Sequence, residues 1–293
     1  MRAAVLNVNK PAGETSFSVV RQLRELTKAK RVGHAGTLDP LATGVLPLLF
    51  GPATKLADYA HQLPKTYAAS IHLGATTITD DAEAELQPVA DPSALTAEVV
   101  NEALKAFVGR IEQQPPAFSA VKVEGQRAYQ RARKGELERP AARTVEIHSI
   151  ELLSFRPGPQ AMAEIEVSCA SGVYLRSLAR DLGEKLGVGG YLGKLIRTAY
   201  GELKVADAAA LTELASAEQI EQRMQSAEAI LPATMTEVRL TVEQETQVRQ
   251  GRSVRIIPPP PPGALRAHNR SGRLVALGHT DALRHTFVPD KVL

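Results

Sequence analysis

Asp39 lies in a glycine- and proline-rich stretch, RVGHAGTLDPLATG, that spans Arg31 to Gly44. A carboxylate on a loop anchored to a rigid core is a common way to present a nucleophile or base. Pro40 fixes its own φ and disfavours helical geometry at Asp39. Three glycines permit backbone angles that other residues resist: Gly33, Gly36 and Gly44. The stretch is therefore predicted to be neither helix nor central strand.

An apolar run, Val45–Phe50, follows this loop and reads as a buried strand, in which Pro47 indicates an edge or a bulge. The loop itself has a simpler interpretation. An aspartate before a proline in a glycine-rich loop usually forms a turn by bonding its own backbone. Spacing alone favours that turn role for Asp39.

Resemblance to a known family reverses this preference. GHAGTLDPLATGVLPL resembles the signature of the bacterial tRNA pseudouridine-55 synthases, the TruB family. In that family the aspartate of the GHxGxLDPxAxG motif is the nucleophile, and Asp39 matches it. Many members have threonine where this chain has Ala35, a change that we do not expect to affect the chemistry.

Four further segments resemble family motifs in the family order. Lys10 begins a segment similar to KPxGxTS, which implies a place near the active site and contact with the substrate, although a lysine in a turn is ordinarily a surface residue. Tyr67 matches the KxY tyrosine that contacts the target uridine, whereas a tyrosine on the apolar face of a strand is usually core. Thr76–Glu85 resembles TxTxDxxG, except that Ala84 replaces the glycine. The segment QQPPAFSA resembles QxPPxYSAxK, with Phe118 in place of tyrosine.

The segment SGVYLRSLARDLGEKLG predicts a helix that opens near Tyr174 and places Arg176 in its first turn. The helix dipole disfavours a cation there, and solvent exposure would remove most of that cost. The resemblance implies instead that Tyr174 and Arg176 line the active site, with the arginine paired to Asp39. It also implies that Leu195 packs near the bound uridine and that His34 inserts into the tRNA loop.

The resemblance implies that a uridine base moves from an N1–C1′ link to a C5–C1′ link without redox chemistry. The Asp39 carboxylate could attack C6 or C1′, or it could remove the C2′ proton to give a glycal. Arg176 would keep Asp39 ionised, Tyr67 would stack on the base, and Tyr174 could deliver or accept a proton. No metal or cofactor is implied by these motifs. Asp80 and Asp81 could suggest a metal, but a solvated loop is favoured because no His or Cys supports them.

Composition limits the class of protein. The chain has 293 residues, 44% of them hydrophobic, which is enough for a sizeable core and a second domain. Cys169 is the only cysteine, which excludes an intrachain disulfide and suits a reducing cytoplasm; it is expected to pack rather than react. No apolar run approaches the roughly 20 residues of a membrane span. Basic residues gather in residues 122–143 and again in residues 246–280. A charge run is usually a solvated face, but two such runs far apart in the chain favour a phosphate-rich partner.

The expected fold is α+β: a pseudouridine synthase domain over residues 1–232, built on a mixed, largely antiparallel sheet. A basic insertion at about residues 110–143 would grip the tRNA arm, with a basic helix at Gly125–Gly135. Thr96–Val108 predicts an amphipathic helix with Val99 facing inward, and Ser16 is a candidate cap for the first helix. After a linker at Pro232–Glu237, residues 236–293 read as short strands that suit a small β-barrel similar to PUA-type RNA-binding domains.

The resemblance therefore implies a cytoplasmic isomerase that converts the uridine at position 55, in the T-arm loop of tRNA, to pseudouridine by base flipping. We expect a monomer with no protein partner. A non-catalytic tRNA-binding or tRNA-folding protein on the same fold is the alternative, and the complete set Asp39, Tyr67, Tyr174 and Arg176 argues against it. A metal-dependent nuclease would want clustered carboxylates, which the sequence does not offer.

Overall fold

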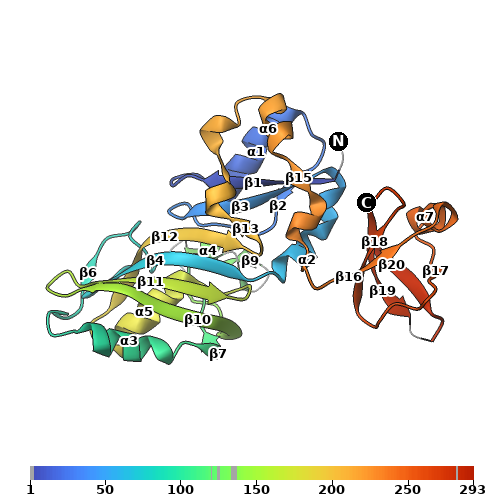
Figure 1. Cartoon of the computed structure of the whole chain (residues 1–293). Helices are drawn as coiled ribbons and strands as arrows, with labels where there is room; N and C mark the ends of the chain where they lie inside the picture. The colour runs from blue at the N-terminus through green and yellow to red at the C-terminus, as the bar shows by residue number, and fades with distance from the viewer. Residues whose placement is uncertain (1–2, 120, 124–125, 133–136, 282) are drawn as a thin grey trace.

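Two sheets hold most of the strands, a large one in the N-terminal part of the chain and a smaller one at the C-terminal end (Figure 1). The computed structural model describes residues 3–119, 121–123, 126–132, 137–281 and 283–293. The main path of the large sheet runs in the order β14-β1-β3-β12-β4-β11-β10-β7, and β2, β13 and β15 pair beside it. Among the described strands of this sheet, β1–β14 and β3–β12 are parallel and the other pairs antiparallel, which confirms the mixed, largely antiparallel sheet.

The strands of the large sheet have the following bounds: β1 (Ala4–Lys10), β2 (Val32–His34), β3 (Thr43–Phe50), β4 (Lys65–Leu73), β7 (Gly109–Gln113), β10 (Arg143–Arg156), β11 (Met162–Cys169), β12 (Gly190–Tyr200), β13 (Leu203–Lys204), β14 (Ala209–Ala210) and β15 (Gln225–Ser226). Two small hairpins lie outside it: β5 (Ala75–Thr76) with β6 (Gln87–Pro88), and β8 (Lys122–Val123) with β9 (Gln126–Arg127).

Helices cover the large sheet at its two ends. In Figure 1, α1 (Ser16–Thr27) and α6 (Ala217–Arg223) lie beside β1, whereas α3 (Ala97–Lys105) and α5 (Leu175–Lys185) lie against β10 and β12. A 3-10 turn (Gly51–Leu56) leads into α2 (Ala57–His61). Apolar residues of these helices and of the central strands form one continuous cluster around Leu6, Leu46, Ile71 and Leu178. This core supports both elements that carry the candidate site, α5 and the loop before β3.

Local sequence explains the helix starts, with two corrections. Thr15, not Ser16, caps α1, because its side chain accepts the backbone N–H of Ser18. Thr96 caps α3 in the same way, and Val100, Ala103 and Leu104 face the core as expected. Val99 does not: it is 47% exposed, since it lies at the edge of the buried stripe.

Pro47 lies inside the large sheet rather than at an edge. The sheet tolerates a proline there because the hydrogen-bond ladder between β2 and β3 is interrupted beside it. The Pro47 carbonyl accepts the N–H of Ala35 (3.0 Å), but proline has no N–H to return to the Ala35 carbonyl. The hydroxyl of Tyr200 donates to that carbonyl instead (2.6 Å). The side chain of a distant tyrosine thus replaces the missing backbone donor.

The expected basic helix at Gly125–Gly135 is described only in part. The structure has α4 at Ala128–Ala132, and Gln126–Arg127 belong to β9 instead. Residues 125 and 133–135, which the prediction also covered, lie outside the described residues.

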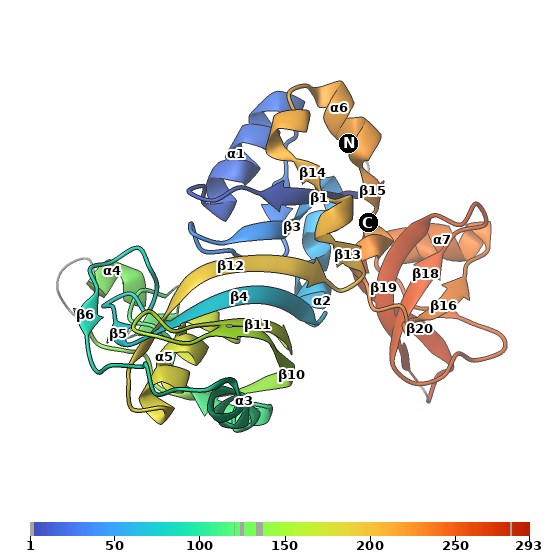
Figure 2. The same cartoon turned by 60° about the vertical axis from the view of Figure 1, so that its left-hand side comes forward.

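The C-terminal sheet has five strands in the order β16-β18-β19-β20-β17 and curls into part of a barrel beside α7 (Figure 2). Their bounds are β16 (Thr236–Arg239), α7 (Val242–Arg249), β17 (Val254–Arg255), β18 (Ala264–His268), β19 (Leu274–Asp281) and β20 (Thr286–Val292). The predicted strands are confirmed in this sheet. The helix α7 was not predicted, although Thr241 and Gln244 form a capping box that signals it.

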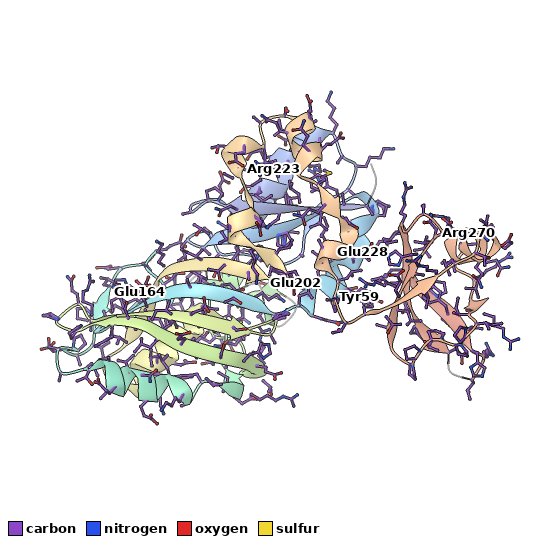
Figure 3. All side chains as sticks on the ribbon, in the orientation of Figure 1. Tyr59, Glu164, Glu202, Arg223, Glu228 and Arg270 are labelled. Atoms are coloured by element: carbon purple, nitrogen blue, oxygen red, sulfur yellow. The ribbon has the colours of Figure 1, made fainter. Side chains whose placement is uncertain are left out.

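The C-terminal sheet has its own apolar core, but it also packs on the N-terminal part. Leu274 and Leu277 of β19 belong to the same buried cluster as Val5, Leu49 and Leu56. At this junction Oε2 of Glu228 lies 3.0 Å from Nε2 of His268 and 3.6 Å from Nη1 of Arg266. Figure 3 shows Glu228 and Tyr59 on the side of the N-terminal part that faces the C-terminal sheet. None of the helices in the described part of the chain has the length and apolar character of a membrane span.

Candidate active site

Asp39 lies on the loop between β2 and β3, and backbone contacts fix this loop to the start of α1. The Ser16 hydroxyl accepts the N–H of Leu38 (2.8 Å) and donates to its carbonyl (3.2 Å). The carbonyl of Pro40 accepts the N–H of Gly13 (2.8 Å). The residues on both sides of Asp39 are therefore held, while its own side chain remains 32% exposed.

The buried ammonium group of Lys10 adds to this restraint. Lys10 is fully buried, and its Nζ donates to the carbonyls of Pro11 (2.7 Å), Glu14 (2.6 Å) and Pro40 (3.2 Å). Burial lowers the Lys10 pKa to about 8, against the opposing effects of nearby carboxylates including Asp39. All three donors are occupied, which favours positioning of the Asp39 loop; the predicted contact of Lys10 with substrate stays a prediction.

Arg176 meets Asp39 as the sequence predicts. Its Nε donates to Oδ2 of Asp39 at 3.0 Å, Nη1 to the carbonyl of Thr79 (3.1 Å) and Nη2 to the carbonyl of Phe118 (3.0 Å). The guanidinium is 6% exposed, so the exposed position that would suit the helix dipole is wrong. The pair is joined through one nitrogen, and the remaining donors attach the guanidinium to two other loops.

Asp80 and Asp81 are buried, which contradicts the expected solvated loop. Asp80 is 3% exposed and accepts from both Nη atoms of Arg139 (2.7 and 2.9 Å) and from Arg180 (3.0 Å). Asp81 lies 3.6 Å from Arg176 and accepts from Thr79 (2.6 Å). Burial raises the Asp81 pKa, opposed by Thr79 and Arg176. The negative charges of these two carboxylates are compensated by arginines that are distant in the sequence.

Arg197 on β12 is a buried cation that holds the Asp39 loop by hydrogen bonds to its backbone. It is 1% exposed and donates to the carbonyls of Val45 (2.6 Å) and Gly36 (3.1 Å). The approach of β12 explains Gly44, which has φ +99° and whose added Cβ would lie 2.2 Å from the Arg197 carbonyl oxygen. The other two glycines do not have positive φ: Gly36 provides room for Tyr200, and Gly33 meets no close neighbour.

Tyr67 and Leu195 lie on the face of the large sheet that also carries Arg197. Tyr67 of β4 pairs with Arg197 of β12, and Ala69 pairs with Leu195, so the four side chains share one face of the sheet. Leu195 is 5% exposed. Burial raises the Tyr67 pKa, as do Cys169 and Asp39, whereas Arg197 opposes the rise. Tyr67 therefore stays a neutral phenol that can stack on a base or donate a hydrogen bond.

Tyr174 and His34 are close in the chain to Arg176 and Asp39, respectively. Tyr174 is the N-cap residue of α5. Its backbone exchanges two hydrogen bonds with the Gln113 side chain (2.8 and 3.1 Å), and Arg143 lies over its ring. His34 ends β2, and its Nδ1 is buried without a hydrogen-bond partner among the described residues. Burial and the Arg197 charge lower the His34 pKa, which keeps the ring neutral.

Two arginines of the candidate site were missed although the sequence carries a signal for them. Arg180 follows Arg176 by four residues, so both lie on one face of α5. Arg197 lies two residues after Leu195 in an alternating strand, where a cation on the buried face needs partners. Across the described ranges, no three or more His, Cys, Asp or Glu side chains are grouped to hold a metal ion.

Comparisons with known proteins match most of the chain to one family. Residues 24–175 match the model of the TruB family pseudouridylate synthase N-terminal domain, and residues 176–238 match that of the tRNA pseudouridylate synthase B C-terminal domain. The chain is 44% identical over 282 residues to tRNA pseudouridine synthase B of Thermobifida fusca, covering 94% of each chain. It is 42% identical over 279 residues to the protein of the same name from Synechococcus elongatus, covering 93% of this chain and 92% of the relative.

Two solved structures share the fold. One is a chain of an H/ACA ribonucleoprotein bound to a substrate RNA containing 2′-deoxyuridine, with TM-score 0.72, 22% identity and coverage of 99% of this chain and 84% of that chain. The other is a chain of a Cbf5-Nop10-Gar1 complex, with TM-score 0.70, 25% identity and coverage of 94% and 78%. The likeness extends over the large sheet and the C-terminal sheet together.

Proposed function

This chain belongs to the TruB family of pseudouridylate synthases, and on that premise we propose that it isomerises a uridine of tRNA to pseudouridine. The enzyme is an isomerase, since the base is detached from C1′ and rejoined to it through C5 with no atom gained or lost. The observation that carries the proposal is the partly exposed Asp39 carboxylate held by Arg176 at 3.0 Å within the family motif.

The arrangement supports a specific division of roles. Asp39 is the nucleophile or base, and Arg176 fixes its orientation through the Nε–Oδ2 contact. Tyr67 stacks on the uracil, Leu195 packs beside it, and Tyr174 delivers or accepts a proton. Lys10 holds the Asp39 loop through the Pro40 carbonyl. Attack at C6, attack at C1′ and removal of the C2′ proton all remain compatible with this geometry.

The substrate is the T-arm stem-loop of tRNA, with the uridine at position 55 as the target. The uridine must leave the loop to reach Asp39, and unstacking it costs a few kcal/mol that backbone contacts and pocket stacking offset. His34 takes the place of the extruded base. The C-terminal sheet acts as a PUA-like RNA-binding domain from residue 236, after a catalytic domain that ends near residue 232. The enzyme acts as a cytoplasmic monomer.

The test is incubation of purified protein with an unmodified tRNA transcript and with its isolated T-arm stem-loop. Nucleoside chromatography after digestion measures pseudouridine, and chemical mapping locates it. We expect about one pseudouridine per RNA, in the T loop of both substrates. RNA that binds the protein but gains no pseudouridine would contradict the assignment and support the non-catalytic alternative.

A further inference from the structure

The solvent face of α1 carries one aromatic and three cationic side chains in a single row. Phe17, Arg21, Arg24 and Lys28 follow one another at spacings of four, three and four residues. At 3.6 residues per turn these positions fall within about 60° of the helix circumference. The first three lie within α1 and Lys28 is its C-cap residue; all four are exposed, Phe17 by 65%. We call these four residues the basic ridge.

The cations of the basic ridge have no carboxylate within ion-pair distance among the described residues. Glu14, at the base of the helix, accepts the Ser18 hydroxyl instead. Glu25 lies beside the ridge without bonding to it. The three charges therefore do not stabilise the helix surface through ion pairs with described carboxylates.

The ridge is fixed to the catalytic loop. Its first residue, Phe17, follows Ser16, whose hydroxyl makes both hydrogen bonds to the backbone of Leu38, the neighbour of Asp39. From that end the helix rises by about 10 Å between Arg21 and Lys28. In Figure 2, α1 lies on the side of the N-terminal part away from the C-terminal sheet. An RNA strand that enters the site at Asp39 could thus continue along the ridge.

We propose that the basic ridge binds the sugar-phosphate backbone of the substrate tRNA beside the target uridine, and that Phe17 stacks on a neighbouring base. The inference rests on the function proposed above. Unpaired cations together with an exposed aromatic ring are the features with which proteins hold unpaired nucleic acid. A protein partner would instead require an apolar centre with a polar rim, and Phe17 is the only large apolar side chain in the row.

The charge test compares two triple variants of the full chain. One replaces Arg21, Arg24 and Lys28 by glutamine, which keeps helix propensity nearly unchanged. The control replaces Lys105, Arg156 and Lys185, exposed residues of α3, β10 and α5 outside the ridge, by glutamine. Binding of whole unmodified tRNA is measured from low to high salt. Each lost phosphate contact lowers the slope of log K against log salt by about 0.7 to 0.9, so the ridge variant should lose roughly 2 to 2.7.

Equal slopes for the ridge and control variants would overturn the phosphate contacts. For the aromatic ring, Phe17→Ala should raise the tRNA KM about tenfold, the usual effect of losing one stacked base, and Phe17→Tyr should stay near wild type. An unchanged KM in Phe17→Ala would overturn the stacking role. Wild-type turnover on the same RNA tests the proposed function separately: absence of pseudouridine with a ridge-dependent salt slope would reject the reaction and keep the ridge.

Discussion

The Nε atom of Arg176 lies 3.0 Å from Oδ2 of Asp39, although the two residues are 137 positions apart in the chain. The two Nη atoms do not share in that contact, because they donate to the carbonyls of Thr79 and Phe118. One guanidinium therefore joins the loop of Asp39, the loop of Asp81 and the segment before α4. The position of the Asp39 carboxylate depends on all three attachments.

Arg176→Lys should lower kcat by roughly 100-fold although the charge is kept. A lysine ammonium can reach Asp39 but cannot hold two carbonyls in fixed directions at the same time, and a misplacement of about 1 Å can cost that much in rate. Single-turnover kinetics on the stem-loop measures the effect. Wild-type kinetics in this variant, with normal thermal stability, would show that the fork of three contacts is not needed.

The activity should fall as pH rises above about 8. Burial lowers the Lys10 pKa to about 8, and the neutral amine has two N–H donors for its three carbonyls, one of which is Pro40 beside Asp39. We expect kcat/KM to decrease between pH 7.5 and 9, and Lys10→Met to be less active without this decrease. A wild-type profile that stays flat to pH 9 would contradict the role given to Lys10.

Thermal stability should not decrease together with the activity as pH rises above about 8. The folded pKa of Lys10 lies below its unfolded value, so above pH 8 the unfolded chain binds more protons and the free energy of unfolding rises with pH. Burial also lowers the pKa of Lys65 to about 8, with the same sign. Melting temperatures measured beside the rates would therefore separate loss of the loop contact from unfolding.

Cys169 should be inert in the folded protein. It is 1% exposed, and burial raises its pKa to about 12, partly offset by Lys65 and Arg197. Relative to an ordinary thiol with pKa about 9, the thiolate fraction at pH 8 falls roughly a thousandfold. A disulfide reagent should find no reactive thiol in the native protein and one thiol per chain in guanidinium. Rapid labelling of the native protein would contradict this and would mean that the strand around Cys169 opens to solvent.

The exposed arginines of the C-terminal sheet should contribute to the salt dependence of tRNA binding. Arg270 and Arg273 lie within ion-pair distance of no described carboxylate, and Figure 3 shows Arg270 at the outer end of that sheet. Replacing both by glutamine should lower the slope by about 1.4 to 1.8. Replacing Arg239 and Arg249, which pair with Glu237 and Glu245, is the matched control and should have less effect. An equal change of slope in the two double variants would mean that Arg270 and Arg273 serve only solubility.

Substitution is a better test of this sheet than deletion of residues 236–293. Leu274 and Leu277 share a buried cluster with Val5 and Leu49 of the large sheet, so deletion would expose apolar surface of the catalytic part. The sequence suggested an independent unit because the change in pattern near residue 238 is sharp. A local pattern cannot reveal which side of a strand packs on a distant strand.

Motifs and alternation predicted much of the site, because they act within a few residues. They placed Asp39 on a loop, Tyr67 on a strand and Arg176 in the first turn of a helix. The Arg176–Asp39 contact followed from resemblance and is confirmed by the geometry. The roles assigned to these side chains stay predictions.

The missed features depend on partners that arrive from elsewhere in the chain. Asp80 is buried because Arg139 and Arg180 meet it from 59 and 100 residues away, and no local pattern shows this. Pro47 is tolerated inside the sheet because Tyr200 supplies the missing donor. An aspartate in a polar segment therefore cannot be predicted to be solvent-exposed until its ion-pair partners are known.

The central claim is that the Asp39 carboxylate performs the reaction, and Asp39→Asn tests it most directly. The amide keeps the size of the side chain but cannot act as nucleophile or base, and binding energy cannot replace that function. The measurement is pseudouridine formed in an unmodified T-arm stem-loop by single turnover, with RNA affinity measured in parallel. The account predicts no detectable pseudouridine from Asp39→Asn and an affinity within a few fold of wild type. Appreciable turnover by Asp39→Asn, in protein shown by mass spectrometry to be free of deamidation, would contradict it.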